Sequence, residues 1–477
     1  MLQYAAMFVP LRLSALIPLA LALLATVAAI AQTPPAATVS DTAAPDLDSQ
    51  RLAAQRSFVR LMEEQRHEEA VTVGTQVLAL TTELHGAADI RLATPLINLG
   101  TANLRLGNLA DAAMRYESAI TLIEEIEGVA SPRLVDALIG LAESQARGQA
   151  WEDANRSYSR ALTLSHAANG LYSTEQLPIL DGLSETWLGM DRLERANDQQ
   201  EAQFRLQKRR AGERRDELVP AYYKLGRWYN RTGQYAEARG AYQSARRVIR
   251  DTKGADHPDA IDALLGEAES YEREGAYPQA AIVLRRALEL ANQQPASEHL
   301  RRAEILLASG DLGIVARLQR SALRDYAAAW AELSADPALG KERDSWFAEP
   351  VRLTGPELPR AVNDKGKSID TRSLRDGPAL QAGQVLASMT ITPEGRARDV
   401  VIQESDPPGL LDRQVLQTLE FTAFRPRLVD GVAVATENHG FRHGFRYPLQ
   451  STQQPVAEPG TGPDAGEAGK PLGNPGG

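Results

Sequence analysis

The chain has 477 residues, of which 43% are hydrophobic and 24% charged, as is usual for a folded protein. Its net charge of −10 and isoelectric point near 5.4 argue against a general nucleic-acid-binding protein, which needs a basic face to displace the counterions of phosphates. The absence of cysteine excludes disulfides, thiol nucleophiles, cysteine-ligated zinc and a lipid-modified N-terminal cysteine.

The N-terminal segment has the features of an export signal. Arg12 precedes an apolar run over 13–30, and Ala29-Ile-Ala31 has the small-x-small pattern that signal peptidases cleave. We therefore expect residues 1–31 to be a signal peptide and residues 32–50, rich in Ala, Thr and Pro, to be a linker. The alternative is an uncleaved membrane anchor, because an apolar run of about 18 residues is at the lower limit for crossing a bilayer.

Seven alanines then recur at a step of 42 residues: Ala70, Ala112, Ala154, Ala196, Ala238, Ala280 and Ala322. Gly100, a small residue, lies twelve positions before Ala112, and Tyr116 and Ala119 lie four and seven positions after it. Most repeats share this pattern. These spacings predict a first helix before each alanine and the apolar face of a second helix after it. Residues that tolerate the dihedrals of a tight turn fall between the two helices at Gly107, Gly233 and Gly275.

The 42-residue period predicts a mainly α protein in which residues 51–335 form a right-handed α-solenoid of about seven helix pairs. Asn98-Leu-Gly100 and Lys224-Leu-Gly226, with the Ala-x3-Tyr-x2-Ala phrases that follow them, resemble the tetratricopeptide repeat. The usual repeat has about 34 residues, so the longer period resembles the kinesin light chain type. Repeats one and four depart from the pattern, and repeat seven lacks the turn glycine.

The resemblance implies a concave groove, lined by the first helices, that receives peptides. By register, the candidate groove residues are Glu143, Glu185, Tyr223, Arg227, Asn230 and Glu269. The competing interpretation is that these polar side chains are simply solvated. The basic and asparagine pattern with which some members of the family bind a C-terminal carboxylate does not occur in register.

Residues 350–450 have a different pattern, of alternating apolar residues and turns. It predicts strands over 384–391 and 397–402, a helix from about 410 to 421 and a last strand over 439–447. Pro393-Glu-Gly395 supplies the turn of the first hairpin, and Pro407-Pro408-Gly409 breaks the chain before the helix. The order β-β-α-β predicts a small α+β domain, followed over 451–477 by a disordered tail rich in Pro and Gly.

Several phrases in this segment resemble the TonB C-terminal domain: Gly383-x-Val385, Ile391-x3-Gly395, Leu411-Asp412, and Phe424-Arg425-Pro426 followed by Gly431. The resemblance implies that the domain binds a partner segment as an added strand. The candidate edge is the last strand, with His439, Phe441, His443, Phe445 and Tyr447. The N-terminal segment lacks the histidine of the family's energy-coupling anchor, and the helical array replaces the family's Pro-rich spacer.

The sequence contains no phosphate-binding loop and no Gly-x-Ser-x-Gly elbow. His439 and His443 would be about 13 Å apart on a strand, too far to share a metal. We expect a non-enzymatic periplasmic scaffold, without cofactor or metal, whose partners are proteins or peptides of the cell envelope, outer-membrane receptor segments among the candidates. The alternative is a TonB-like energy transducer for outer-membrane transport, anchored in the inner membrane by its N-terminal segment.

Overall fold

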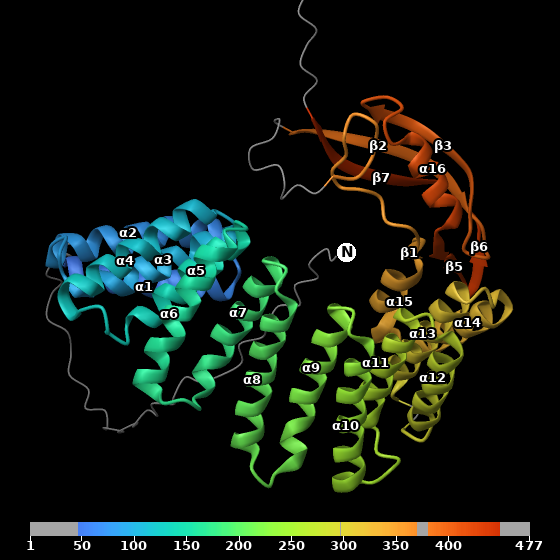
Figure 1. Ribbon diagram of the computed structural model, residues 1–477, viewed down its shortest axis with the longest axis horizontal. Helices are drawn as coiled ribbons and strands as arrows, with labels where there is room; N and C mark the ends of the chain where they lie inside the picture. Colours follow the sequence, from blue (N-terminus) through green and yellow to red (C-terminus); the bar gives the residue numbers. More distant parts are fainter. Residues whose placement is uncertain (1–45, 296, 370–379, 449–477) are drawn as a thin grey trace, which may run out of the picture. The chain divides into compact units, whose positions relative to one another are not determined.

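The computed structural model describes residues 46–295, 297–369 and 380–448 (Figure 1). The expected signal peptide, most of the linker and the expected tail lie outside these residues. The chain forms two compact units, Met1–Leu290 and Ala291–Gly477. In the described parts of both, no helix has the length and apolar character needed to cross a membrane.

The predicted array of helix pairs is confirmed. The first helices are α1 (Leu47–Glu63), α3 (Ala93–Leu106), α5 (Leu134–Arg147), α7 (Leu177–Gly189), α9 (Val219–Arg231), α11 (Ala260–Arg273) and α13 (His299–Val315). The second helices are α2 (His67–His85), α4 (Leu109–Glu127), α6 (Trp151–Asn169), α8 (Leu193–Ala211), α10 (Tyr235–Lys253), α12 (Tyr277–Asn292) and α14 (Gln319–Ala335). α1 begins at Leu47, before the expected start of the array at residue 51.

The seven alanines of the 42-residue ladder each lie in the first turn of a second helix, and all are fully buried. A methyl group at this position lets the two helices of a pair approach closely without leaving a cavity. The turns that precede the second helices are equally regular. Residues 65, 107, 149, 191, 233, 275 and 317 all have positive φ, at +93° in Gly107 and at +61° in Arg317. Repeat seven therefore makes the same turn without the glycine.

Tyrosines connect successive repeats. The ring of Tyr116 lies between Gly100 of its own repeat and Gly140 of the next, where an added Cβ would meet ring atoms at 2.9 Å and 2.2 Å. Tyr242 occupies the same position between Gly226 and Gly266, with corresponding distances of 2.7 Å and 2.2 Å. Glycine is needed at these helical positions because any side chain would occupy the volume of the ring.

Repeat four replaces this tyrosine with Gln200, and a polar cluster takes the place of the aromatic contact. The carboxylate of Asp181 accepts hydrogen bonds from Gln200 at 3.3 Å, from Gln203 at 2.8 Å and from the ammonium group of Lys224 at 2.6 Å. Lys224 stands 42 residues after Gly182, at the position that is glycine where a tyrosine packs. The departure of repeat four from the repeat pattern is thus compensated within the next repeat.

The C-terminal unit contains the predicted strand–strand–helix–strand order. β2 (Leu380–Ile391) lies at the centre of an antiparallel sheet of order β3-β2-β7, between β3 (Ala397–Asp406) and β7 (Thr436–Pro448). α16 (Asp412–Phe421) contributes Val415 and Leu419 to a core with inward side chains of β2. Four short strands were not predicted: β1 (Val351–Thr354), β4 (Ala423–Arg425), β5 (Arg427–Val429) and β6 (Val432–Val434).

The seventh helix pair belongs to the same compact unit as the strands. α13, α14 and the short helix α15 (Gly340–Phe347) share a core with β4 and β5, which contains Tyr326, Phe347 and Leu428. The guanidinium of Arg425 donates two hydrogen bonds to the Asp311 carboxylate, at 2.9 Å and 2.6 Å. Both side chains are largely buried, and the hydroxyl of Tyr326 donates to the same carboxylate at 2.8 Å. The sequence boundary expected between residues 335 and 350 falls inside this shared core.

Candidate protein-binding surfaces

β7 lies at one edge of the three-stranded sheet, and its outer side has free backbone groups. Arg446 donates its backbone N–H to Arg360 and accepts from the N–H of Val362, so its backbone groups point away from β2. In a strand the backbone groups of alternate residues point to the same side, so those of Gly440, Arg442 and Gly444 also point outward. In the described parts of the chain, these outward groups have no hydrogen-bond partner.

The side chains predicted from the sequence belong to the residues that alternate with Gly440, Arg442 and Gly444 along β7. Phe445 and His443 are buried, and Phe441 and Tyr447 pack partly buried against the core beneath the sheet. His443 Nε2 lies 2.9 Å from the carbonyl oxygen of Pro359, so the ring donates this hydrogen bond. Burial lowers the pKa of His443 below its ordinary value. These side chains therefore orient the strand, and the backbone of the intervening residues is what a partner strand could reach.

Two glycines flank Arg442 on the open side of β7. A Cβ added to Gly440 would meet no atom within 4 Å, and at Gly444 the nearest atom is 4.0 Å away. Neither glycine has the positive φ that would require it. The guanidinium of Arg442 donates to Gln384 Oε1 at 2.6 Å and extends across the open face. Packing among the described residues does not require glycine at either position, and small residues leave room for the backbone of another chain.

The groove candidates all lie on first helices, as their register predicts. Glu143 of α5 accepts a hydrogen bond from Arg147 at 2.7 Å, and Glu185 of α7 pairs with Arg231 of α9. The hydroxyl of Tyr223 donates to the backbone carbonyl of Asp259 at 2.8 Å. The contact of Glu143 lies within α5, whereas those of Glu185 and Tyr223 connect neighbouring repeats. All three contacts occupy polar groups that were candidates for binding a ligand.

Asn230 and Glu269 contact each other across α9 and α11. Asn230 is 3% exposed and donates to Glu269 at 3.3 Å and to the carbonyl of Gly266 at 3.2 Å, while Ser270 donates to its side-chain oxygen at 2.7 Å. A buried amide with this many partners has a structural role. Arg227, by contrast, is exposed on the same helix.

A pocket that the sequence did not indicate lies at the N-terminal end of the array. It has a volume of about 480 Å³ and is lined by first helices α1, α3 and α5 and by the ends of α2 and α4. Its lining residues include the apolar Ile97 and Ile123. The charged ones are Arg51, Arg91, Arg133 and Asp136. Mixed apolar and charged walls suit a peptide side chain with a polar end. Arg51 and Arg91 come from different repeats and share no motif, so only the folded array brings them together.

Two of the arginines that line this pocket, Arg51 and Arg91, pair with carboxylates that are not among its lining residues. Arg51 donates from Nε and Nη2 to Asp48, and Arg91 donates from the same two atoms to Asp89. This pairing fixes the orientation of each guanidinium and leaves its Nη1 group for a further acceptor. Within the described ranges, no group of three or more His, Asp or Glu side chains is placed to hold a metal ion.

Paired helices at a 42-residue step and an antiparallel sheet covered by one helix define a helical repeat protein with a small α+β module. Two families match the chain: the tetratricopeptide repeat, over residues 58–125 and 217–293, and the Gram-negative bacterial TonB protein C-terminal domain, over residues 379–441. The chain therefore carries tetratricopeptide repeats followed by a TonB C-terminal domain. The repeats imply protein partners and the TonB domain implies the cell envelope; both families are typically non-catalytic, and no catalytic family matches.

Several solved structures share the helical repeats at low similarity. BtubC from P. vanneervenii is 18% identical, with 52% of this chain and 92% of that chain covered and a TM-score of 0.35. Putative kinesin light chain repeats from Podosopora anserina are 15% identical, with 52% and 96% covered and a TM-score of 0.29. The C-terminal part of a repeat protein from Cytophaga hutchinsonii is 13% identical, with 61% and 98% covered and a TM-score of 0.38. No curated protein matches the chain.

Proposed function

We propose that the chain is an exported, non-enzymatic scaffold of the periplasm that binds protein or peptide segments at two surfaces. The repeats take peptides in their groove, and the TonB C-terminal domain takes an extended segment as an added strand along β7. The proposal rests on the outer backbone groups of β7 at Gly440, Arg442 and Gly444, for which residues 46–295, 297–369 and 380–448 supply no hydrogen-bond partner. An extended segment that pairs there would form main-chain hydrogen bonds at alternate residues, each worth about 0.5–1.5 kcal/mol net.

The length of the binding edge follows from its neighbours. The segment over 360–362 already pairs with Arg446, which closes the edge at that end. At the other end Asn438 has a positive φ of 54°, which interrupts the regular strand geometry. A partner strand would therefore pair over the stretch from Gly440 to Gly444 and would be short.

Proline substitution tests strand addition directly. Arg442→Pro removes an outward N–H without removing a hydrogen bond to β2, whereas Arg442→Ala removes the side chain and keeps the N–H. The probes are synthetic peptides that copy the N-terminal periplasmic segments of TonB-dependent receptors, and binding to the full chain is followed by fluorescence anisotropy. We expect Arg442→Pro to weaken binding at least tenfold and Arg442→Ala to have a much smaller effect. Equal affinities for wild type and Arg442→Pro would refute strand addition at this edge.

Peptide binding in the groove is tested separately, because a negative result there would not contradict strand addition at β7. The pocket formed by Arg51, Arg91 and Arg133 is the candidate binding position, together with exposed Arg227. In a photo-crosslinking experiment, a photoreactive residue at position 97 should capture envelope polypeptides that a residue at the exposed position 240 of α10 does not. Equal labelling from both positions would argue against a peptide-binding groove at this end of the array.

Location is tested by the mature N-terminus. Mass spectrometry of the protein from its native cell should give a first residue of Gln32 if the chain is exported and cleaved. An intact N-terminus would instead support the alternative of an inner-membrane-anchored energy transducer.

A further inference from the structure

Positive charge concentrates on one edge of the repeat array, at the turn that ends repeat four, although the chain has a net charge of −10. Residues 205–217, which end α8 and form the following turn, contain six Lys or Arg and three Asp or Glu, a net charge of +3. In the windows at the same register of the neighbouring repeats, 79–91, 121–133, 163–175 and 247–259, carboxylates equal or outnumber cations. The positive charge is therefore a property of this one repeat.

The last turn of α8 presents these cations to solvent. Lys208, Arg209 and Arg210 are all exposed. A helix C-terminus favours cations, but this effect does not require three in succession. Lys208 and Arg210 form no ion pair within the described residues, and the guanidinium of Arg209 lies over the ring of Tyr172, 3.9 Å from its centroid. The charges are therefore available to an external anion.

The loop beside this turn exposes two large apolar side chains. Leu171 is 61% exposed and Tyr172 is 56% exposed, in the connection between α6 and α7. The stacking of Arg209 on Tyr172 joins the loop to the cations of α8 in one patch. We call Leu171, Tyr172, Lys208, Arg209 and Arg210 the basic tip.

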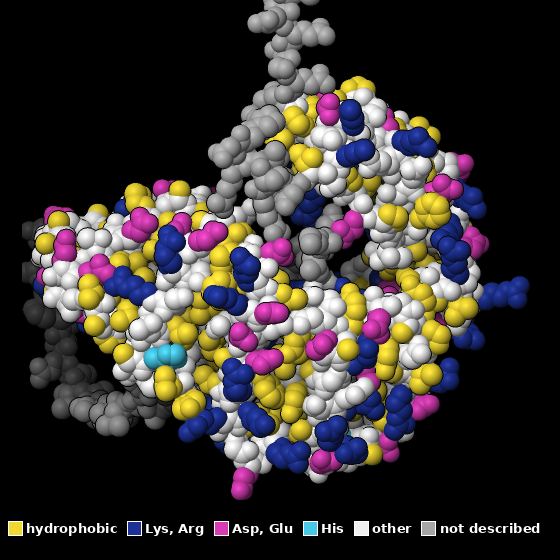
Figure 2. Space-filling view, in the orientation of Figure 1, with side chains coloured by type: hydrophobic (Ala, Val, Ile, Leu, Met, Phe, Trp, Pro, Cys, Tyr) yellow, Lys and Arg dark blue, Asp and Glu magenta, His cyan; other side chains and the backbone are white. Residues whose placement is uncertain are grey.

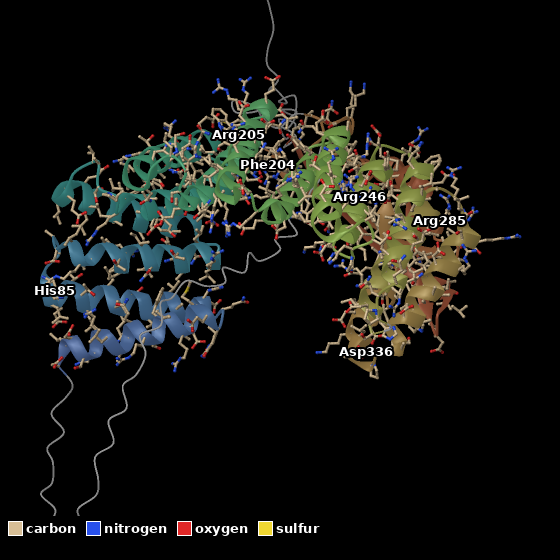
Figure 3. The ribbon with its side chains drawn as sticks, turned by 90° about the horizontal axis from the view of Figure 1, so that it is seen from below. His85, Phe204, Arg205, Arg246, Arg285 and Asp336 are labelled. Carbon is tan, nitrogen blue, oxygen red and sulfur yellow. The ribbon has the colours of Figure 1, made fainter. Side chains whose placement is uncertain are left out.

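An ion pair connects the turn that follows α8 to the neighbouring repeat. Arg215 lies 3.9 Å from Asp251 at the end of α10. Figure 2 shows Lys and Arg side chains gathered along the lower edge, over α8 and α10. Figure 3 faces this edge and labels Arg205, Arg246 and Arg285 on three successive second helices. The basic tip itself lies at the end of α8 and in the loop before α7.

We propose that the basic tip binds the anionic phospholipid surface of a membrane. Long cationic side chains reach headgroup phosphates while their stems lie against apolar groups, and each Lys or Arg near an anionic leaflet contributes to binding. Leu171 and Tyr172 are residue types that enter the headgroup boundary, where an aromatic ring with a polar end is favoured. An exposed tip can contact a flat bilayer, and an acidic polypeptide would be expected to make use of a groove instead.

Vesicle binding by the full chain tests the inference. The probes are vesicles of phosphatidylcholine with 30% phosphatidylglycerol and vesicles of phosphatidylcholine alone, with binding measured by sedimentation. The apolar N-terminal segment can enter either kind of vesicle, so the relevant quantity is the ratio of the two affinities. Loss of one cation weakens binding to an anionic surface by about fivefold, so Lys208→Gln/Arg210→Gln should reduce this ratio about 25-fold.

Matched controls separate the tip from general electrostatics. Arg56→Gln/Arg60→Gln makes the same charge change at exposed positions of α1 and should leave the ratio within twofold of wild type. Leu171→Ser should weaken binding to anionic vesicles severalfold, whereas Val129→Ser, at the same loop position one repeat earlier and 68% exposed, should not.

Three results would overturn the inference. The first is an equal affinity of the wild-type chain for both kinds of vesicle. The second is an equal loss of binding in the α1 control pair. The third is binding to soluble polyglutamate that depends on Lys208 and Arg210 without any preference for anionic vesicles, which would assign the tip to acidic polypeptides.

Discussion

The contact between Tyr116 and Gly140 predicts a large effect from a single methyl group. In Gly140→Ala the added Cβ would lie 2.2 Å from Cζ and 2.3 Å from Cε1 of the Tyr116 ring, a separation that real Cβ atoms do not show. The ring cannot turn aside easily, because Tyr116 is buried and its hydroxyl is 3.0 Å from that of Thr101. Forced repacking of a dense core costs about 1–3 kcal/mol. The gain in helix propensity, about 0.5–1 kcal/mol, offsets only part of this cost.

The matched control is Gly240→Ala, in the exposed face of α10, where an added Cβ meets no atom within 4 Å. It should stabilise the protein by about 0.5–1 kcal/mol, so the two substitutions are expected to have opposite signs. Amide hydrogen exchange with mass spectrometry measures both effects, because it reports the stability of each repeat separately. Protection should fall in α4 and α5 for Gly140→Ala. Unchanged or increased protection there would refute the proposed role of the tyrosine.

Three further predictions concern other contacts. Arg317 and Gly233 both have positive φ, a conformation that is strained in a residue with a Cβ and relaxed in glycine. Arg317→Gly should therefore raise the free energy of unfolding by about 0.5–1 kcal/mol, and Gly233→Ala should lower it by about 1 kcal/mol. Urea unfolding that gives the same sign for both would contradict this. Arg425→Met should cost about 3 kcal/mol in the C-terminal unit, because the largely buried Asp311 carboxylate loses its charged partner and keeps the hydrogen bond from Tyr326. Hydrogen exchange of β4 should detect this loss. Because burial lowers the pKa of His443 in the folded state, the unfolded chain binds the proton first, so stability should fall as the pH drops below the ordinary value of 6.5. The melting temperature of His443→Phe should therefore fall less between pH 7.5 and pH 5 than that of the wild type.

The seven helix pairs could be predicted because each repeat places an alanine where only a small side chain fits between the two helices. A fully buried alanine at the start of each second helix permits no larger side chain, so the period survives in the sequence even where other positions vary. The compensation in repeat four could not be predicted from its own residues. It depends on Lys224 of the next repeat, whose ammonium group reaches Asp181 only in the folded array.

The strands of the TonB C-terminal domain were predicted in order but not in full. β4, β5 and β6 have three residues each, too few for an alternating pattern to be recognised. From the sequence, the side chains of His439 to Tyr447 at alternate positions were predicted as the binding edge of β7. In the described parts of the chain, the backbone groups without a partner belong instead to the residues between them. Which backbone groups face outward is decided by the contacts of Arg446 with 360–362, and these depend on tertiary structure.

The shared core between the seventh helix pair and the strands constrains how this protein can change its length over evolution. In a repeat array each unit contacts only its neighbours, so a unit can be added or removed without breaking distant contacts. Here α13 and α14 carry contacts specific to the strands, such as Asp311 to Arg425, so a copied unit inserted after α14 would separate residues that must meet. Related chains should therefore differ in the number of repeats before residue 291 and keep one helix pair of this type directly before the strands.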